Sequence, residues 1–186
     1  MKKNNSKKIE AKYEELEQYD SCWNDDVMTK KEEKYAYYIG TFLIRFSSLE
    51  HSLDIEVANL INANFHDLGY ILTKDVSMFG KIELFYNLAF QQVNLTEKRK
   101  NQKIKQLTAI RKILENLATL RNKIAHAKWN TLDKDGYVRI DTKISKENGF
   151  IKFKKTKINL TIMGRGMKEI EILKEKLPTF VENVWQ

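Results

Sequence analysis

Arg121, Asn122 and His126 place a fixed cation, an amide and an imidazole within six residues of the chain. If this stretch is helical, a rotation of about 100° per residue brings Asn122 and His126 onto neighbouring turns, with the small Ala125 on the same side. Histidine transfers protons near neutral pH, and the planar guanidinium of arginine matches phosphate oxygens. These three side chains, called the motif residues below, therefore suit cleavage of RNA, whose 2′-hydroxyl is a built-in nucleophile.

A long helix must position the motif residues, because apolar side chains recur every three or four positions from about Glu97 to Ala127. Arg121 occupies a place in that apolar stripe, where a guanidinium is costly unless it is paired or faces a partner. If the helix continues through Trp129, both Lys128 and Trp129 share its motif-bearing side and are candidate supporting residues. We favour a packing role for Trp129, because large aromatic side chains are usually buried.

The sequence RNKIAH at the end of a long helix resembles the Arg-x(4–6)-His signature of HEPN domains, in which a polar residue, often Asn, follows the arginine. Arg121, Asn122 and His126 match this signature, and the resemblance covers about residues 31–128 and the final helix. HEPN domains are small helical bundles that often dimerise through their motif helices. Many are metal-independent endoribonucleases of toxin–antitoxin, abortive-infection and CRISPR systems. The resemblance implies that Arg121 and His126 are catalytic and that Asn122 orients His126 or holds a phosphate oxygen.

Apolar periodicity predicts three further helices, over residues 31–61, 76–91 and 167–185. Asp75 is a candidate N-cap for the second of them, and Met163–Met167 is expected to be a flexible entry to the last. A switch to alternating apolar and polar residues predicts a β-hairpin over 130–160, with a turn cluster at Ser145–Gly149. The predicted fold class is therefore mostly α, a HEPN-like antiparallel helical bundle over 31–186 with a β-hairpin insertion before the C-terminal helix.

Positive charge is concentrated in one block of the chain. Residues 98–157 carry 18 basic and 5 acidic side chains, whereas the remainder is balanced or acidic. Such a block is typical of a surface that binds a polyanion, with RNA or DNA phosphates as the leading candidates. The alternative is a solvent-exposed, lysine-rich surface without a binding role. We expect RNA contacts from four lysines, Lys123, Lys152, Lys154 and Lys155.

Glu50 borders the apolar stripe of the first long helix. A carboxylate in that place could support Arg121 or His126 in the catalytic site. The alternative is that Glu50 is a solvated residue on the flank of its helix, as most such carboxylates are.

The composition limits the class of protein. The chain has 186 residues, of which 42% are hydrophobic, with one proline and one cysteine, and this predicts one helical domain without disulfides or a multi-cysteine zinc site. Neither a metal nor a cofactor is expected, because no histidine pair has ligand spacing and no P-loop is present. We expect neither a membrane span nor a signal peptide, because no apolar run is long enough for either. A soluble, cytoplasmic protein is therefore expected. Residues 1–30 are predicted to be an extension with a disordered basic tip, in which residues 9–20 can form a short helix.

Three functions are compatible with these features. The leading one is a homodimeric, metal-independent endoribonuclease that dimerises through the motif helix and acts as a toxin or phage-defence effector on RNA. The second is a non-catalytic HEPN-like module that binds RNA or a nucleotide with the same residues. The third is a protein-interaction subunit whose basic face meets an acidic partner, such as an antitoxin.

Overall fold

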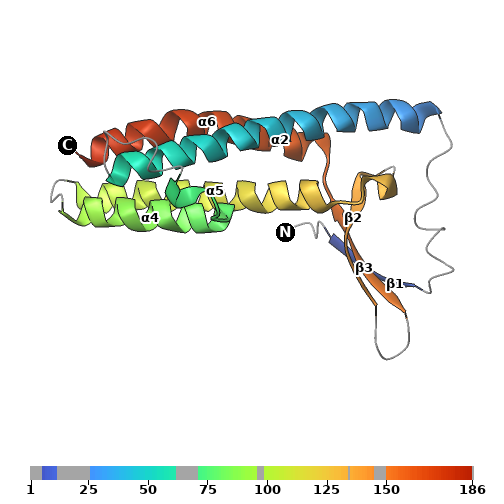
Figure 1. Cartoon of the computed structure of the whole chain (residues 1–186). Coiled ribbons are helices and arrows are strands. Elements are labelled where there is room, and N and C mark those ends of the chain that lie inside the picture. The colour runs from blue at the N-terminus through green and yellow to red at the C-terminus, as the bar shows by residue number, and fades with distance from the viewer. Residues whose placement is uncertain are drawn as a thin grey trace. The chain divides into compact units, whose positions relative to one another are not determined.

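The structure is a computed structural model that describes residues 6–11, 26–61, 71–95, 99–133, 135–144 and 150–185. The expected helical bundle, with a β-hairpin before the last helix, is confirmed (Figure 1). None of the described helices is long and apolar enough to cross a membrane. In chain order the elements are β1 (Ser6–Ala11), α2 (Asp26–Ile61), α4 (Met78–Leu95), α5 (Lys100–His126), the short 3-10 helix η2 (Trp129–Thr131), β2 (Tyr137–Ile144), β3 (Ile151–Lys157) and α6 (Leu160–Val184).

The described residues form two compact units. One, the hairpin unit, consists of described residues within 1–41 and 122–164 and contains the strands, η2 and the ends of three helices. The other, the bundle unit, consists of described residues within 42–121 and 165–186. Residues 1–30 were predicted to be an extension of one domain, but their described strand belongs to the same compact unit as the hairpin.

The bundle unit is built from α2, α4, α5 and α6, whose apolar faces enclose its core. Most members of the predicted stripes are buried, because spacing of three or four residues puts them on one side of each helix. Phe79, at the start of the predicted stripe of α4, is an exception and is 44% exposed. Ion pairs also join the helices. Arg45 on α2 pairs with Glu171 on α6. Arg111 on α5 pairs with Glu83 on α4 at 2.6 Å. The largest fully buried side chains of this unit include Phe42, Phe46, Leu49, Leu53, Phe85, Leu107, Leu114 and Leu117.

The hairpin unit contains an antiparallel sheet with the strand order β1-β3-β2. The predicted hairpin is confirmed as β2 and β3, with a register shift between Arg139 and Asp141. Gly136, in the turn before β2, has a φ of 83°, a conformation that glycine adopts without steric cost. The predicted turn cluster at Ser145–Gly149 lies outside the described residues.

The prediction of a disordered tip and a helix near the N-terminus is wrong for the described residues Ser6–Ala11. This segment is the strand β1, which pairs antiparallel with β3 over six positions and places Ile9 opposite Phe153. A short isolated helix is marginal in water, whereas the edge of β3 offers a complete row of backbone partners. The rest of the predicted helix, residues 12–20, lies outside the described residues.

The start of α6 also differs from the prediction of a flexible Met163–Met167 segment, because the helix begins at Leu160. The side chain of Asn159 accepts a hydrogen bond from the backbone N–H of Ile162 at 2.9 Å, as an N-cap does. Gly166 is needed there for close approach, since a Cβ atom on it would lie 2.7 Å from a ring carbon of Phe42. This glycine therefore permits helix contact and does not mark a flexible segment.

The start of α4 is two residues later than predicted, at Met78. The hydroxyl of Ser77 accepts a hydrogen bond from the backbone N–H of Gly80 at 3.2 Å. Ser77, and not the predicted Asp75, therefore caps this helix.

Candidate active site

The motif residues lie on the last two turns of α5, which is helical from Lys100 to His126. Asn122 and His126 are exposed one turn apart, whereas Arg121 is half-buried. Ile124, which lies on the side of the helix opposite Asn122 and His126, is 1% exposed, so the helix end is anchored by its apolar face. The division between the two compact units falls between Arg121 and Asn122, within the continuous helix.

The condition that the helix continues through Trp129 is not met, because α5 ends at His126, one residue before the predicted end at Ala127. Trp129 begins η2, and its indole N–H donates a 2.9 Å hydrogen bond to the carbonyl of Ile124. This bond satisfies one of the carbonyl groups that a helix C-terminus leaves without an intrahelical partner. The indole also contacts the ring of Tyr35, with centroids 5.9 Å apart. Trp129 therefore caps and packs the helix end, and does not share a helical arc with the motif residues.

Lys128 leaves the helix as well and connects its end to the sheet. Its backbone N–H donates a 2.8 Å hydrogen bond to the carbonyl of Arg139 on β2. The backbone N–H of Arg139 in turn donates to the hydroxyl of Thr131 at 2.8 Å. His126 thus lies only two residues before a hydrogen-bonded connection to β2, which limits the movement of this helix end relative to the strand.

Asp133, in the loop after η2, affects the ionisation of Tyr35. The carboxylate of Asp133 accepts hydrogen bonds from the backbone N–H groups of Asp135 and Tyr137, at 3.0 and 2.9 Å. Lys31 donates to the backbone carbonyl of Asp133 at 2.9 Å. Burial raises the pKa of the Tyr35 hydroxyl, and the negative charge of Asp133 raises it further. Tyr35 therefore remains neutral at physiological pH.

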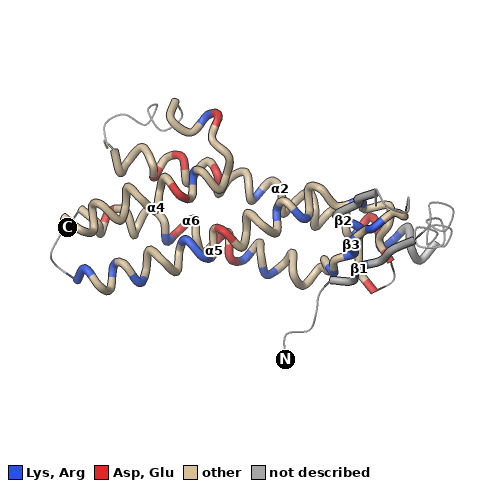
Figure 2. The backbone as a smooth tube through the Cα atoms, turned by 90° about the horizontal axis from the view of Figure 1, so that it is seen from below, with Lys and Arg blue, Asp and Glu red and all other residues tan. Residues whose placement is uncertain are grey.

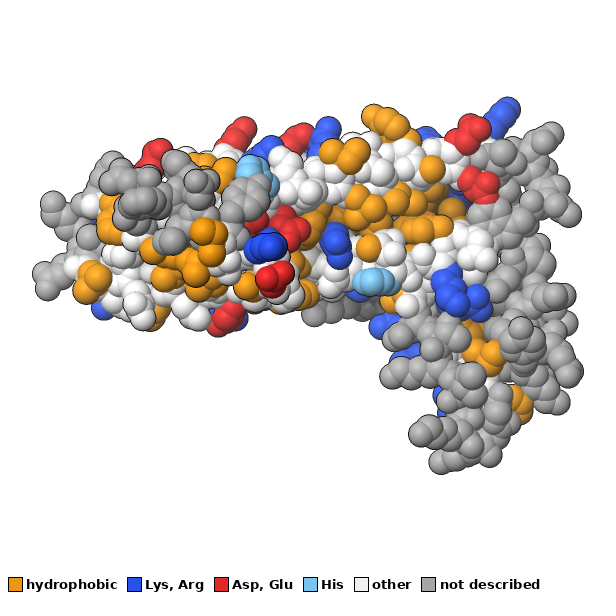
Figure 3. Space-filling model, in the orientation of Figure 1, with side chains coloured by type: hydrophobic (Ala, Val, Ile, Leu, Met, Phe, Trp, Pro, Cys, Tyr) orange, Lys and Arg blue, Asp and Glu red, His pale blue; other side chains and the backbone are white. Residues whose placement is uncertain are grey.

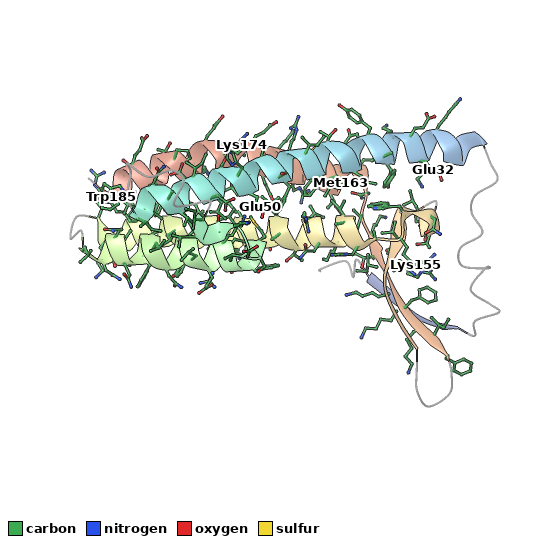
Figure 4. The ribbon with its side chains drawn as sticks, viewed as in Figure 1. Glu32, Glu50, Lys155, Met163, Lys174 and Trp185 are labelled. Carbon is green, nitrogen blue, oxygen red and sulfur yellow. The ribbon has the colours of Figure 1, made fainter. Side chains whose placement is uncertain are left out.

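Glu50, the predicted supporting carboxylate, forms an ion pair with Lys81 of α4 at 3.0 Å. Asp54, one turn further along α2, also lies 3.0 Å from the Lys81 ammonium. Figure 4 shows Glu50 between α2 and α4, and Figure 3 shows acidic and basic side chains in contact at that place. Burial lowers the pKa of Lys81, but hydrogen bonds to Asp54 and Glu50 outweigh burial, so that the pKa is raised. Glu50 thus has a role in joining two helices.

Sequence reasoning missed Lys81, although a signal was present. Lys81 is 7% exposed and shares the buried face of α4 with Phe85 and Ala89, which follow it at intervals of four residues. A lysine on an apolar stripe is costly to bury unless a carboxylate pairs with it, and the same reasoning was applied to Arg121 on α5. Asp54, on the first long helix, was the available carboxylate.

The four lysines predicted to bind RNA differ in exposure. Lys152 is exposed, and Lys123 and Lys154 are half-buried. Lys155 is only 5% exposed, and its ammonium lies 4.0 Å from the carboxylate of Asp133. Figure 4 places Lys155 at the end of the sheet near η2. Because strand residues alternate between faces, Lys155 shares the buried face of β3, and its assignment as an RNA contact is corrected.

Other features of the described residues do not involve the motif residues. A cleft of about 460 Å³ lies between α5 and α6 of the bundle unit, with Ile110, Ile113 and Phe180 among its lining residues. Among the described residues, no three His, Cys, Asp or Glu side chains are grouped so that they could hold a metal ion. Comparisons of the chain with protein-family models, curated proteins and solved structures find no match.

Proposed function

We propose that the chain is a metal-independent endoribonuclease of the HEPN type, acting on RNA as a toxin or phage-defence effector. The observation that supports this proposal is the position of Arg121, Asn122 and His126 at the C-terminal end of α5. His126 is exposed and can reach a substrate, and Arg121 is half-buried on the same helix end. Both properties suit a site in which one residue moves protons and another stabilises charge.

The proposed reaction needs no group from outside the RNA and the protein. The 2′-hydroxyl oxygen attacks the adjacent phosphorus while His126 removes the hydroxyl proton. A bond from phosphorus to the 2′-oxygen forms, and the bond to the 5′-oxygen breaks. The leaving 5′-oxygen receives a proton from a protonated His126 imidazole, that of the same chain or of a second copy, so the products are a 2′,3′-cyclic phosphate and a 5′-hydroxyl. Arg121 stabilises the negative charge that grows on the phosphoryl oxygens, and Asn122 orients the imidazole one turn away.

A cleavage assay in excess EDTA tests this function directly. We expect the wild-type chain to cut RNA and to leave 2′,3′-cyclic phosphate ends, which mass spectrometry identifies. His126→Ala and Arg121→Ala should each abolish cleavage while retaining the circular dichroism spectrum and melting temperature of a folded protein. Lys105→Ala is the matched control, because Lys105 is exposed on the same helix and outside the motif.

Two results would overturn the catalytic proposal. Full cleavage by either motif variant would exclude the proposed roles. Tight RNA binding without any cleavage by the wild-type chain would favour the non-catalytic module, and binding only to an acidic protein would favour the interaction subunit.

A further inference from the structure

An exposed isoleucine and the cleft of the bundle unit share one face of α6. Ile172 is 46% exposed, although it is a large aliphatic residue. It precedes Lys176 and Thr179, which line the cleft between α5 and α6, by four and seven residues. Residues at this spacing lie on the same side of a helix. This face of α6 therefore carries an apolar side chain at one level and a cleft about two turns further along.

The buried lining of the cleft is apolar. Ile110 and Phe180 are 6% and 5% exposed, and Ile113 is half-buried. The hydroxyl of Thr179 donates a 2.9 Å hydrogen bond to the carbonyl of residue 175, and the amide of Asn183 donates a 2.7 Å hydrogen bond to the carbonyl of Thr179. Because these polar lining residues direct hydrogens to their own helix, the cleft suits an apolar side chain better than a polar ligand.

Four exposed charges surround these features, and they balance. Lys168, Glu175 and Glu182 recur at intervals of seven residues, so that they lie along one edge of the face, and Lys176 is next to Glu175. None of the four forms an ion pair within the part of the chain that the structure describes. Two positive and two negative charges do not favour a polyanion such as RNA on this face.

The order of these charges complements an antiparallel copy of the same helix. About a two-fold axis at Glu175, Lys168 of one chain lies opposite Glu182 of the other, because each is seven residues from the axis. The same axis brings Ile172, three residues from it, to within about 1.5 Å of the level of Thr179, four residues from it on the other chain. The exposed isoleucine of each copy thus meets the cleft of the other.

We propose that this face of α6, together with the α5 wall of the cleft, binds a second copy of the chain in a two-fold symmetric dimer. Ile172 of each copy enters the cleft of the other, and Lys168 pairs with Glu182 on both sides of the axis. Near the axis, Glu175 of each copy lies beside Lys176 of the other. This surface is separate from the end of α5, through which the resemblance to HEPN domains implies dimerisation. The proposal does not depend on RNA cleavage.

Sedimentation equilibrium of the full chain tests the apolar part of this interface. The wild-type chain should self-associate, and Ile172→Gln should raise the dissociation constant by about a hundredfold, because each dimer loses two buried isoleucines. Ile44→Gln is the matched control. Ile44 is 73% exposed on α2, so its replacement removes an equally large apolar side chain from another helix and should leave the association unchanged.

Charge reversal provides a test that a folding defect cannot imitate. Lys168→Glu alone and Glu182→Lys alone each place like charges opposite each other, so each should weaken association by about tenfold. Both changes in one chain restore opposite charges and should restore the dimer, and a mixture of the two single variants should form heterodimers. Lys100→Glu is the control, because Lys100 is exposed nine residues before Ala109, on the side of α5 opposite this lining residue of the cleft.

Each outcome decides for or against the α6 interface. A wild-type chain that is monomeric at about 100 μM would overturn it. An assembly whose mass does not change in Ile172→Gln would also overturn it and would leave the end of α5 as the contact. Failure of the double charge variant to restore association would exclude the pairing of Lys168 with Glu182. Since the measured quantity is mass and not cleavage, the nuclease proposal can fail while this interface stands.

Discussion

Arg121 occupies a position where the apolar stripe of α5, after Leu114 and Leu117, would place another aliphatic residue. Both of those leucines are almost fully buried, whereas Arg121 is half-buried. The aliphatic stem of an arginine can cover apolar surface while its guanidinium reaches a more polar environment. A side chain anchored in this way is suited to holding a phosphate in a defined direction.

Replacing Arg121 by Lys separates charge from geometry at this position. Lysine retains the positive charge and most of the stem, but it lacks the planar pair of donors that can bind two phosphate oxygens. We expect RNA cleavage to fall by roughly tenfold or more, with a melting temperature close to that of the wild-type chain. A lysine variant that cleaves at the wild-type rate would show that only the charge is required.

Two glycines inside helices make a matched pair for testing local packing. A Cβ atom on Gly166 would lie 2.7 Å from Phe42 and 3.0 Å from Leu120, whereas a Cβ atom on Gly40 would meet nothing within 4 Å. Gly166→Ala should therefore lower the free energy of unfolding by about 1–3 kcal/mol. Gly40→Ala should raise it by about 0.5–1 kcal/mol, because alanine favours the helix. Denaturant unfolding measures both, and a stabilising Gly166→Ala would contradict the close contact.

At the scale of elements, α4 is joined to α2 by Lys81 between Asp54 and Glu50. The ammonium lies 3.0 Å from each carboxylate, and its side chain is 8% exposed. In such a cluster the loss of one member is costly mainly because the charges that remain are left buried. Exposed ion pairs elsewhere on the surface contribute much less.

Lys81→Met is expected to lower the free energy of unfolding by about 3–5 kcal/mol, because Asp54 and Glu50 then lack their shared cation. Adding Asp54→Asn to this variant should recover part of the loss, since one buried charge is removed. Lys112→Met, at an exposed position on α5, is the control and should change stability by less than about 0.5 kcal/mol. A small effect of Lys81→Met in urea unfolding would mean that water replaces the ammonium without cost.

The contacts that hold the elements should also weaken at alkaline pH. Tyr35 and Lys81 both have pKa values raised above their ordinary values of 10.0 and 10.5. The folded chain therefore holds these protons more tightly than the unfolded chain does. Their contribution to stability is complete below about pH 10 and is lost as the pH rises through the folded-state pKa values.

Melting temperatures between pH 9 and pH 11 test this expectation. The wild-type chain should lose stability steadily above about pH 10, and Tyr35→Phe should lose less over the same interval because its hydroxyl cannot ionise. Identical pH profiles for the two proteins would show that Tyr35 does not contribute.

At the scale of the whole molecule, positive charge is shared by both compact units. The sequence of α5 contains seven Lys or Arg residues and one acidic residue, and Figure 2 shows these basic positions recurring along the helix. The three strands contain eight Lys or Arg residues and two acidic ones. The basic block of the sequence is therefore present on a helix and on a sheet, and the motif residues are at the end of that helix.

A composite active site in a homodimer is a further expectation of the proposed function. Cleavage benefits from both a base and an acid, and each chain supplies one motif histidine. In a two-fold symmetric dimer through the motif helix, two copies of His126 would meet in one cleft. Mixed dimers of wild-type and His126→Ala chains, purified with two tags, should then lose almost all cleavage. About half of the wild-type activity would instead indicate two independent sites, and an active monomer would exclude the shared site.

The sequence by itself determined those features that depend on local periodicity. Apolar spacing of three or four residues predicted the long helices and their buried sides, and alternation predicted β2 and β3, because each pattern follows from the geometry of its own element. The placement of Arg121, Asn122 and His126 together on one helix end was also predictable, since six consecutive helical residues need no distant partner.

Tertiary structure decided the features that depend on residues far away in the chain. β1 forms because β3 has an edge to pair with, and α5 ends at His126 where Lys128 bonds to Arg139. Lys155 is buried because its face of the sheet is covered, although Lys154, the residue before it, is half-buried. In each case the local sequence permits more than one conformation, and a long-range hydrogen bond or contact selects between them.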